Sequence, residues 1–397
     1  MKIGVLNYRF DFYTYTRTIV NILPEAEYVK VQDVYSTLNR LARKVNRTLG
    51  KNLLSTFDLN NQYQDFGRSG VDILHFMNGV SYGSIPWVTS FETIVPRLAS
   101  LMTRHQGTEE IAAMAEPKTR HAFEALAGPH CKRLLPWSSN SAALQRDLLD
   151  EFPQYREDIL PKITVLHPPQ ALLVHSYDEK QLETNGRVRF VLVGAAFFRK
   201  GGREILATFE RMVRQYHYPI ELVIVSSLRI EDYAARETEA DVARARQMIA
   251  DNRDWITYHE HLPNAEVLAL MKSAQVGLLP TYADTYGLSV LELQACGCPV
   301  ITSDVRALPE MNDNEAGWLI AVPKNRFGEG LYTTPAEREA LSAALSTGLE
   351  AAVHEIFADL SLIRRKGEAA LRKVAAEHDP ENYAAALRAV YSDAVKR

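Results

Sequence analysis

The 397-residue chain has three cysteines, no long apolar run and a net charge of only −4. Cys131 stands alone and Cys296 and Cys298 form a Cys-Gly-Cys segment, which disfavours both a disulfide framework and a zinc site. We therefore expect buried thiols and no bound metal. The weak net charge disfavours binding to bulk nucleic acid, which is recognised by strongly basic surfaces.

The chain also lacks the features of a secretory leader. Residues 1–10, MKIGVLNYRF, lead directly into a strand-like run, and no apolar stretch is long enough to span a bilayer. A hydrophobic content of 46% and a charged content of 24% are typical of globular proteins. We expect a cytoplasmic protein with two domains of ordinary size.

Short apolar runs alternate with helical patterns throughout the chain. The strands expected in the first half are Ile3–Leu6, Tyr28–Val31, Val71–Met77, Trp87–Ser90, Arg133–Trp137 and Ile163–Leu166. Those expected in the second half are Val188–Val193, Glu221–Val225, Ile256–Tyr258, Val276–Leu279, Pro299–Thr302 and Trp318–Ile320. Such alternation is typical of parallel sheets with helices on both faces, so we predict two doubly wound α/β domains.

The expected domain boundary lies at His167-Pro-Pro-Gln170, where a strand ends in a Pro-Pro turn. We assign residues 1–170 to an N-terminal domain and residues 171–378 to a C-terminal domain. Residues 379–397 have the pattern of an amphipathic helix, which places Tyr383, Leu387, Val390 and Tyr391 on one side.

The most informative stretch is Asp284–Glu310, DTYGLSVLELQACGCPVITSDVRALPE. A strand precedes it, a helical pattern follows the Tyr-Gly turn, and the apolar run CPVIT predicts another strand. In an α/β protein this unit places ligand chemistry at the carboxyl end of a strand, against a helix N-terminus. The N–H groups available to an anion such as a diphosphate are those of Tyr286, Gly287, Leu288 and Ser289. Asp284 and Glu292 are carboxylates that suit hydroxyl groups, so the segment fits a sugar nucleotide.

This segment resembles the E-x7-E region of retaining family 4 glycosyltransferases of the GT-B fold, the glycosyl transferases group 1. The family form is E-x-F-G-L-x-x-L-E-A-M-A-x-G-x-P-V-I, and Asp284–Ile301 keeps its spacing but begins with Asp. The resemblance implies two Rossmann-like domains that face each other across a cleft, with the last helix returning to the N-terminal domain. It also implies that Glu292 binds the ribose hydroxyls and that Asp284 binds the hydroxyls of the donor sugar.

A second segment, Val193–Gly202, follows a strand and opens a helix. Gly194 permits a tight turn, and Arg199 and Lys200 are cations suited to phosphate. The segment resembles the G-R…K-G segment of the family, in which Arg and Lys neutralise the leaving diphosphate. Ala195 stands where the family has Arg, so Arg199 either substitutes from another position or one cationic contact is lost. A solvated position is the alternative for both cations.

Three further segments resemble the family less closely. Tyr258–Leu262 stands where the family has F-x-G-x-V, whose backbone meets the nucleobase, and Glu260 occupies the Gly position. Pro86–Glu92 resembles P-V-V-x-T-x-H, whose His reaches the donor sugar; here Glu92 is expected to hold a sugar or acceptor hydroxyl, or else to be an ordinary helix-start acid. Asp72–His75 resembles a D-V-V-H strand end, where His75 is either functional or packs in the core.

Residues 38–54 combine a basic face with an apolar one. The cations are Arg40, Arg43, Lys44, Arg47 and Lys51, and the apolar residues at helical spacing are Leu38, Leu41, Val45, Leu49 and Leu53. A basic amphipathic helix fits an anionic membrane surface, in peripheral contact with the inner membrane face, or a phosphorylated acceptor. The alternative is a helix that packs on its sheet and leaves its basic face in solvent.

Together these features predict a glycosyltransferase of the hexosyltransferase type that needs no cofactor. The resemblance to the family implies that it is retaining and metal-independent. Its donor is a nucleoside-diphosphate sugar, UDP- or GDP-linked, and its acceptor is a glycan, a lipid-linked molecule or a protein. Two other functions fit the departures at Ala195 and Glu92. One is an inactive nucleotide-sugar-binding subunit, and the other is a sugar-nucleotide epimerase of the same fold.

Overall fold

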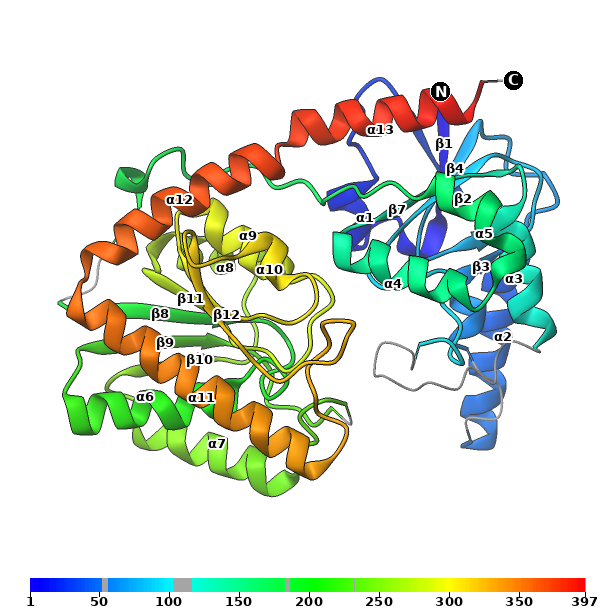
Figure 1. Ribbon diagram of the computed structural model, residues 1–397. Helices are drawn as coiled ribbons and strands as arrows, with labels where there is room; N and C mark the ends of the chain where they lie inside the picture. Colours follow the sequence, from blue (N-terminus) through cyan, green and yellow to red (C-terminus); the bar gives the residue numbers. More distant parts are fainter. Residues whose placement is uncertain (52–55, 103–115, 181, 183–185, 232, 397) are drawn as a thin grey trace. The chain divides into compact units, whose positions relative to one another are not determined.

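The computed structural model describes residues 1–51, 56–102, 116–180, 182, 186–231 and 233–396 (Figure 1). They form two compact units, one of residues 1–169 with 380–397 and the other of residues 170–379. Both boundaries between the units lie one residue from those expected from the sequence.

The N-terminal unit is built on a parallel sheet with the strand order β2-β1-β4-β6-β7. The sheet strands are β1 (Lys2–Leu6), β2 (Glu27–Val31), β4 (Ile73–Met77), β6 (Trp87–Phe91) and β7 (Cys131–Pro136). A separate parallel pair consists of β3 (Gln62–Tyr63) and β5 (Val80–Ser81). The helices are α1 (Tyr13–Thr18), α2 (Val34–Leu49), α3 (Pro117–Ala127), α4 (Ser139–Asp150), α5 (Arg156–Ile159) and α13 (Pro380–Ala394).

The C-terminal unit has a six-stranded sheet with the order β10-β9-β8-β11-β12-β13, and every pairing is parallel. Its strands are β8 (Val188–Val193), β9 (Ile220–Val225), β10 (Ile256–His259), β11 (Val276–Leu279), β12 (Val300–Ser303) and β13 (Gly317–Ile320). Its helices are α6 (Gly202–Tyr216), α7 (Glu239–Asp251), α8 (Asn264–Ser273), α9 (Leu288–Ala295), α10 (Leu308–Met311), α11 (Pro335–Ala358) and α12 (Ser361–Glu377). Helices α6, α7 and α11 cover one face of this sheet, and α8, α9 and α12 cover the other (Figure 1).

The predicted strands match the observed ones to within two residues, with one exception. Ile163–Leu166 is not a strand, because it makes only one isolated parallel bridge, between Ile163 and Leu134. Two backbone hydrogen bonds tie it to the outside of β7, from Thr164 to Leu134 and from Leu166 to Pro136, each 2.9 Å. Pro168 and Pro169 follow after His167, and proline has no N–H with which to extend the pairing.

The basic helix begins and ends earlier than the stretch 38–54 expected from the sequence. Helix α2 runs from the N-cap Asp33, whose carboxylate accepts from Ser36 N, to the C-cap Gly50 with a left-handed φ of +61°. Glycine adopts this conformation at little cost, so Gly50 ends the helix before Lys51. Residues 52–55, which include Leu53, lie outside the described part of the chain. None of the described helices is long and apolar enough to cross a membrane.

Helix α13 completes the core of the N-terminal unit, although it lies more than 200 residues beyond the other elements of that unit. Tyr383 donates a 2.8 Å hydrogen bond to the carbonyl of Thr18, and Tyr391 Oη lies 2.5 Å from Nδ1 of His75 on β4. Nε2 of His75 lies 2.9 Å from the hydroxyl of Ser90. Both nitrogens of the fully buried ring are therefore engaged, and His75 is a packing residue.

Burial lowers the pKa of His75 from 6.5 to about 3. The unfolded chain therefore binds a proton below pH 6.5 that the folded chain does not, and the group destabilises the fold as the pH falls from 6.5 toward 3. We predict that acidification from pH 6.5 to 5 lowers the free energy of unfolding by about 2 kcal/mol more in the wild type than in His75→Gln.

Urea unfolding at several pH values measures this difference. His130→Gln is the matched control, because it removes an exposed imidazole of the same unit. Parallel pH profiles for His75→Gln and the wild type would contradict the account.

Candidate functional site

The strand order of the C-terminal sheet reverses at β8, which has β9 on one side and β11 on the other. All the strands are parallel, so their carboxyl ends lie at one edge of the sheet. Ligands of open α/β sheets bind at such a reversal, beyond the carboxyl ends of the strands. The segment Gly194–Lys200 follows β8, and the segment Pro280–Gly287 follows β11. The two segments predicted from the sequence therefore meet at the switch point.

Glycines let the segment after β8 fold tightly. Gly194 has a φ of +145°, and a β-carbon there would collide with Cε of Lys200. Gly201 has a φ of +77°, and a β-carbon there would collide with the carbonyl oxygen of Pro280. Gly194 makes room for the lysine side chain, and Gly201 lets the start of α6 rest directly on the end of β11.

Lys200 and Asp284 form a buried ion pair. Their Nζ and Oδ2 atoms are 2.9 Å apart, and only 11% and 12% of the two side chains are exposed. Arg199 lies at the margin of this pair, with Nη1 3.9 Å from Oδ2 of Asp284. The same nitrogen donates a 2.7 Å hydrogen bond to the carbonyl of Ala283, and Nε lies 3.3 Å from a carboxylate oxygen of Glu231. Arg199 is thus fixed by three partners, one of them Glu231, which the sequence analysis did not identify.

Two opposing effects set the pKa of Asp284. Burial raises it, but the charge and hydrogen bond of Lys200, the charge of Arg199 and the N–H of Tyr286 lower it further, so that the pKa lies below its ordinary value of 3.8. Asp284 is therefore ionised at neutral pH, and it presents a carboxylate to any ligand that enters the switch point.

Backbone contacts hold the segments after β8 and β11 in register. Tyr282 N donates a 2.9 Å hydrogen bond to the carbonyl of Arg199. The Thr281 hydroxyl lies 2.9 Å from the carbonyl oxygens of both Arg199 and Ala283. On the next strand, Ser303 donates a 2.6 Å hydrogen bond to the carbonyl of Thr281. Lys200 and Asp284 are therefore brought together by the main chain as well as by their charges.

Helix α9 begins at Leu288, with Gly287 as its N-cap at a φ of +88°. The sequence predicts Tyr286 N as a free donor, but Tyr286 N donates to Oδ1 of Asp284 at 3.3 Å, so this donor is already used. The N–H groups of Gly287, Leu288 and Ser289 open the helix, where intrahelical acceptors are lacking. Glu292 lies half-buried on the second turn of the same helix.

The loops after β9 and β10 border the same edge of the sheet. Ser226 and Ser227, at the end of β9, donate hydrogen bonds to the carbonyls of Gly194 and Ala195, the latter at 2.5 Å. These hydroxyls fix the loop in which the family arginine is replaced by alanine. Glu260 is exposed after β10 and lines a pocket of about 360 Å³ with Tyr258. The cations of that pocket are Arg229, Arg246 and Arg253, none of which was singled out from the sequence.

Residues 175–331 match the family model described as glycosyl transferases group 1. This stretch includes every residue from Gly194 to Glu292 considered above. Residues 175–331 form a glycosyl transferases group 1 domain. The resemblance seen in the motifs is thereby confirmed over this part of the chain.

Curated and solved relatives agree with this assignment. Glycogen synthase of Mycobacterium tuberculosis is 25% identical over 206 residues, which cover 52% of this chain but only 42% of that protein. Sucrose-phosphate synthase from Thermosynechococcus elongatus superposes with a TM-score of 0.55 at 16% identity, over 92% of this chain and 80% of that one. Anabaena Alr3699/HepE in complex with UDP superposes with a TM-score of 0.53 at 13% identity, over 92% and 86% of the two chains. These structures share the GT-B fold, and the predicted fold class is confirmed.

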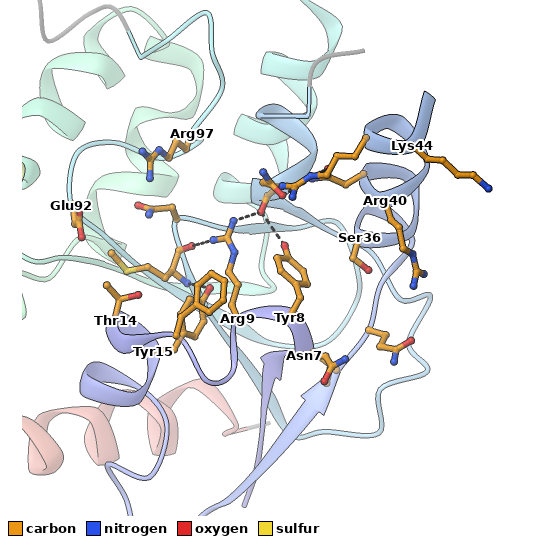
Figure 2. A pocket seen from close by; sticks show the side chains of 18 of the residues that line it. Asn7, Tyr8, Arg9, Thr14, Tyr15, Ser36, Arg40, Lys44, Glu92 and Arg97 are labelled. Atoms are coloured by element: carbon orange, nitrogen blue, oxygen red, sulfur yellow. Dashed lines mark hydrogen bonds between the residues drawn. The ribbon is translucent and has the colours of Figure 1, made fainter. Parts of the chain in front are cut away.

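The N-terminal unit contains a larger pocket, of about 990 Å³ (Figure 2). Glu92, which follows β6 and does not start a helix, lines this pocket, so the helix-start alternative is wrong. Figure 2 shows Arg9 in the middle of the pocket wall, Glu92 and Arg97 on one side, and Arg40 and Lys44 of α2 on the other. Neither Arg9 nor Arg97 could be identified from the sequence, because each is an isolated cation within an irregular segment.

The Lys200–Asp284 pair gives a stability test for the C-terminal unit. We predict that Lys200→Met lowers the free energy of unfolding at pH 7 by about 3–5 kcal/mol, because it leaves the buried carboxylate of Asp284 without its closest cation. The double variant Lys200→Met/Asp284→Asn should regain most of this loss. The folded-state pKa of Asp284 is lowered, so the pair contributes fully above about pH 3.8, and its contribution is lost as the pH falls through the lowered value.

Urea unfolding of the single and double variants measures the coupling. Arg365→Met is the control, because its ion pair with Asp359 is exposed and its loss should cost at most about 1 kcal/mol. A double variant no more stable than Lys200→Met would show that Lys200 and Asp284 do not stabilise the fold through their ion pair.

Proposed function

We propose that the protein is a retaining, metal-independent glycosyltransferase that moves a sugar from a nucleoside-diphosphate sugar to an acceptor. The observation that carries the proposal is the buried Lys200–Asp284 pair beside the start of α9, at the switch point of a glycosyl transferases group 1 domain. A cation, a helix N-terminus and an ionised carboxylate within one loop cluster suit a molecule with a diphosphate at one end and hydroxyls at the other.

Each group has a role in this proposal. Lys200 and the N–H groups of Gly287, Leu288 and Ser289 bind the diphosphate, and Lys200 exchanges part of its contact with Asp284 for a phosphate oxygen. Asp284 then accepts hydrogen bonds from hydroxyls of the donor sugar.

The remaining residues act around this centre. Glu292, one helical turn further along α9, takes the ribose hydroxyls. Gly194 gives the diphosphate close access to the backbone, and Glu260 lies on the base side. Arg199, held by Glu231 and Ala283, adds positive charge next to Asp284.

The chemistry follows from where charge develops. The bond between the anomeric carbon and the diphosphate oxygen breaks, and the acceptor oxygen forms the new bond on the same face of the sugar. The proton of the acceptor hydroxyl passes to the departing phosphate. Preorganised cations and N–H groups that stabilise the leaving diphosphate supply the dominant effect in such catalysis, which explains how the reaction proceeds without a metal.

The donor base is uracil or guanine in this proposal. Anabaena Alr3699/HepE, which shares the fold, binds UDP. The acceptor is bound by the N-terminal unit, where Glu92 contributes a carboxylate for a hydroxyl group.

Nucleotide binding provides the first test. We predict that either UDP or GDP, but not ADP or dTDP, raises the thermal unfolding temperature, and that magnesium leaves the shift unchanged. A ligand at 100 times its dissociation constant stabilises the folded state by about 2.7 kcal/mol. Absence of a shift with all four nucleotides would overturn the proposed donor site.

Variants separate binding from turnover. Glu292→Ala should weaken nucleotide binding roughly 10- to 100-fold, because it removes hydrogen bonds to a charged acceptor. Asp284→Asn should keep nucleotide binding, because it leaves Lys200 and the α9 donors in place, and should lower the transfer rate by about 100-fold or more. Glu266→Ala, an exposed carboxylate on α8, is the control and should change neither quantity.

The rival functions give different results in the same assays. An inactive binding subunit shows the nucleotide shift but no turnover with any acceptor or donor. An epimerase consumes the nucleotide sugar in the absence of an acceptor. Full transfer activity in both folded variants would show that the site is elsewhere.

A further inference from the structure

The N-terminal sheet has a switch point of its own, and the large pocket lies there. Strand β1 has β2 on one side and β4 on the other, so the strand order reverses at β1. The pocket is lined by residues that follow the carboxyl ends of these strands, including Asn7 and Arg9 after β1, Gln32 after β2 and Asn78 after β4. Ligands of open parallel sheets bind at this edge. The position of the pocket in the fold therefore points to a ligand site before its charge is considered.

The charge of the pocket is strongly one-sided. Six lining residues are cationic and one is acidic: Arg9, Arg40, Arg43, Lys44, Arg47 and Arg97 against Glu92. The chain as a whole carries a slight excess of acids, so this excess of positive charge is local. Within one concave site, like charges repel one another and raise the affinity for an anion.

The cations of α2 converge on the pocket because of their spacing. Arg40, Arg43 and Arg47 stand at positions i, i+3 and i+7, which share one face of a helix. Arg43 donates a 3.0 Å hydrogen bond to the side chain of Asn39, a neutral partner. Among the described residues, no carboxylate forms an ion pair with any of these three arginines. Their guanidinium groups are therefore available to a ligand.

Arg9 is held in the pocket wall by carbonyl groups. Nη1 donates to Met77 O at 3.2 Å, and Nη2 donates to Asn60 O at 2.8 Å. Carbonyl partners fix the guanidinium without neutralising its charge, so Arg9 contributes a fixed positive charge. The neighbouring aromatic side chains of Tyr8 and Phe12 are 39% and 57% exposed, and they add apolar surface beside the charged groups.

We infer that this pocket binds a phosphate-bearing ligand through Arg40, Arg43 and Arg47 of α2 together with Arg9, and, resting on the proposed function, that this ligand is the sugar acceptor. Arginine forms paired hydrogen bonds with phosphate oxygens, which accounts for five arginines and one lysine in a single pocket. Glu92, the one carboxylate, then faces the hydroxyl end of the ligand.

The alternative function of α2 is binding to an anionic membrane surface. Leu38, Leu41 and Leu49 are 44%, 58% and 54% exposed, and their spacing places them on a different face of the helix from Arg40 and Arg43. A flat bilayer does not reach the guanidinium of Arg9, which belongs to the same concave site. The cations therefore favour a ligand that enters the pocket.

Calorimetric binding of matched probes to the full chain tests the inference. Glucose 6-phosphate should bind and glucose should not, and the affinity should fall with added salt because the contact is ionic. Arg40→Gln/Arg43→Gln/Arg47→Gln should weaken binding by about tenfold or more. Arg120→Gln, an exposed arginine of α3 in the same unit, should leave binding unchanged.

Vesicles distinguish a soluble phosphate ester from a lipid-linked one. The probe is a phosphatidylcholine vesicle that contains about 20% phosphatidic acid, an anionic lipid that attracts basic segments. If the wild type binds these vesicles and the arginine variant does not, a lipid-linked phosphate is supported. The inference is overturned if Leu41→Ser/Leu49→Ser abolishes vesicle binding while the arginine variant keeps it, or if no phosphate-bearing probe binds.

Folding and the proposed function are checked separately. Circular dichroism and the unfolding midpoint show whether the triple variant is folded. If it is unstable, the binding measurement uses Arg40→Gln alone, which changes an exposed position. The nucleotide-induced thermal shift should persist in these variants, because the donor site lies in the other unit. If the wild type binds no phosphate-bearing probe while its nucleotide shift is intact, the pocket assignment alone is refuted. Phosphate binding by the wild type without sugar transfer refutes the proposed function alone.

Discussion

The close contact between Gly201 and the end of β11 is the constraint on which the C-terminal site depends. Any side chain at Gly201 would collide with the carbonyl oxygen of Pro280, so only glycine lets α6 start against that strand. Lys200 and Asp284 approach within hydrogen-bonding distance because of this contact. Thr281 and Tyr282 then tie the two segments together through the carbonyl of Arg199. The backbone arrangement therefore determines the electrostatics of the site.

The two units apply the same topological rule to different chemistry. In each sheet the strand order reverses once, and the residues that follow the flanking strands gather at that point. The C-terminal unit places one buried ion pair there, in which a lysine and an aspartate compensate each other. The N-terminal unit places a set of arginines there whose charges are only slightly compensated by Glu92. The first arrangement suits a ligand with both a diphosphate and hydroxyls, and the second suits a predominantly anionic one.

Much of the C-terminal unit could be predicted because its signals are local. Strands such as Val188–Val193 are continuous apolar runs, and Asp284–Ile301 carries turn, helix and strand patterns at fixed spacing. The pairing of Lys200 with Asp284 was not predicted, because it joins residues 84 positions apart through a loop conformation. The use of Tyr286 N by Asp284 was missed for a related reason: a free N–H cannot be distinguished from a bonded one by residue type.

The N-terminal pocket was less predictable, because its residues come from five separate segments and share no motif. Arg9 and Arg97 become neighbours of α2 only through the folded sheet, whereas the basic face of α2 was visible from its periodicity. Ile163–Leu166 has the composition of a strand, but its pairing is restricted by the prolines that follow. Sequence patterns predict elements well, and they predict contacts between distant elements only where a motif spans both.

The place of α13 in the N-terminal unit bears on the order in which the chain acquires structure during synthesis. Tyr383, Leu387 and Tyr391 are buried against elements that leave the ribosome several hundred residues earlier. Until α13 is made, the apolar surface it covers and the ring of His75 face water or other molecules. The C-terminal unit, whose residues are continuous in the chain, can close its core before the N-terminal unit does. Of these two units, the one whose synthesis starts earlier is thus completed later. During that interval its core surface is exposed to contacts that α13 later excludes.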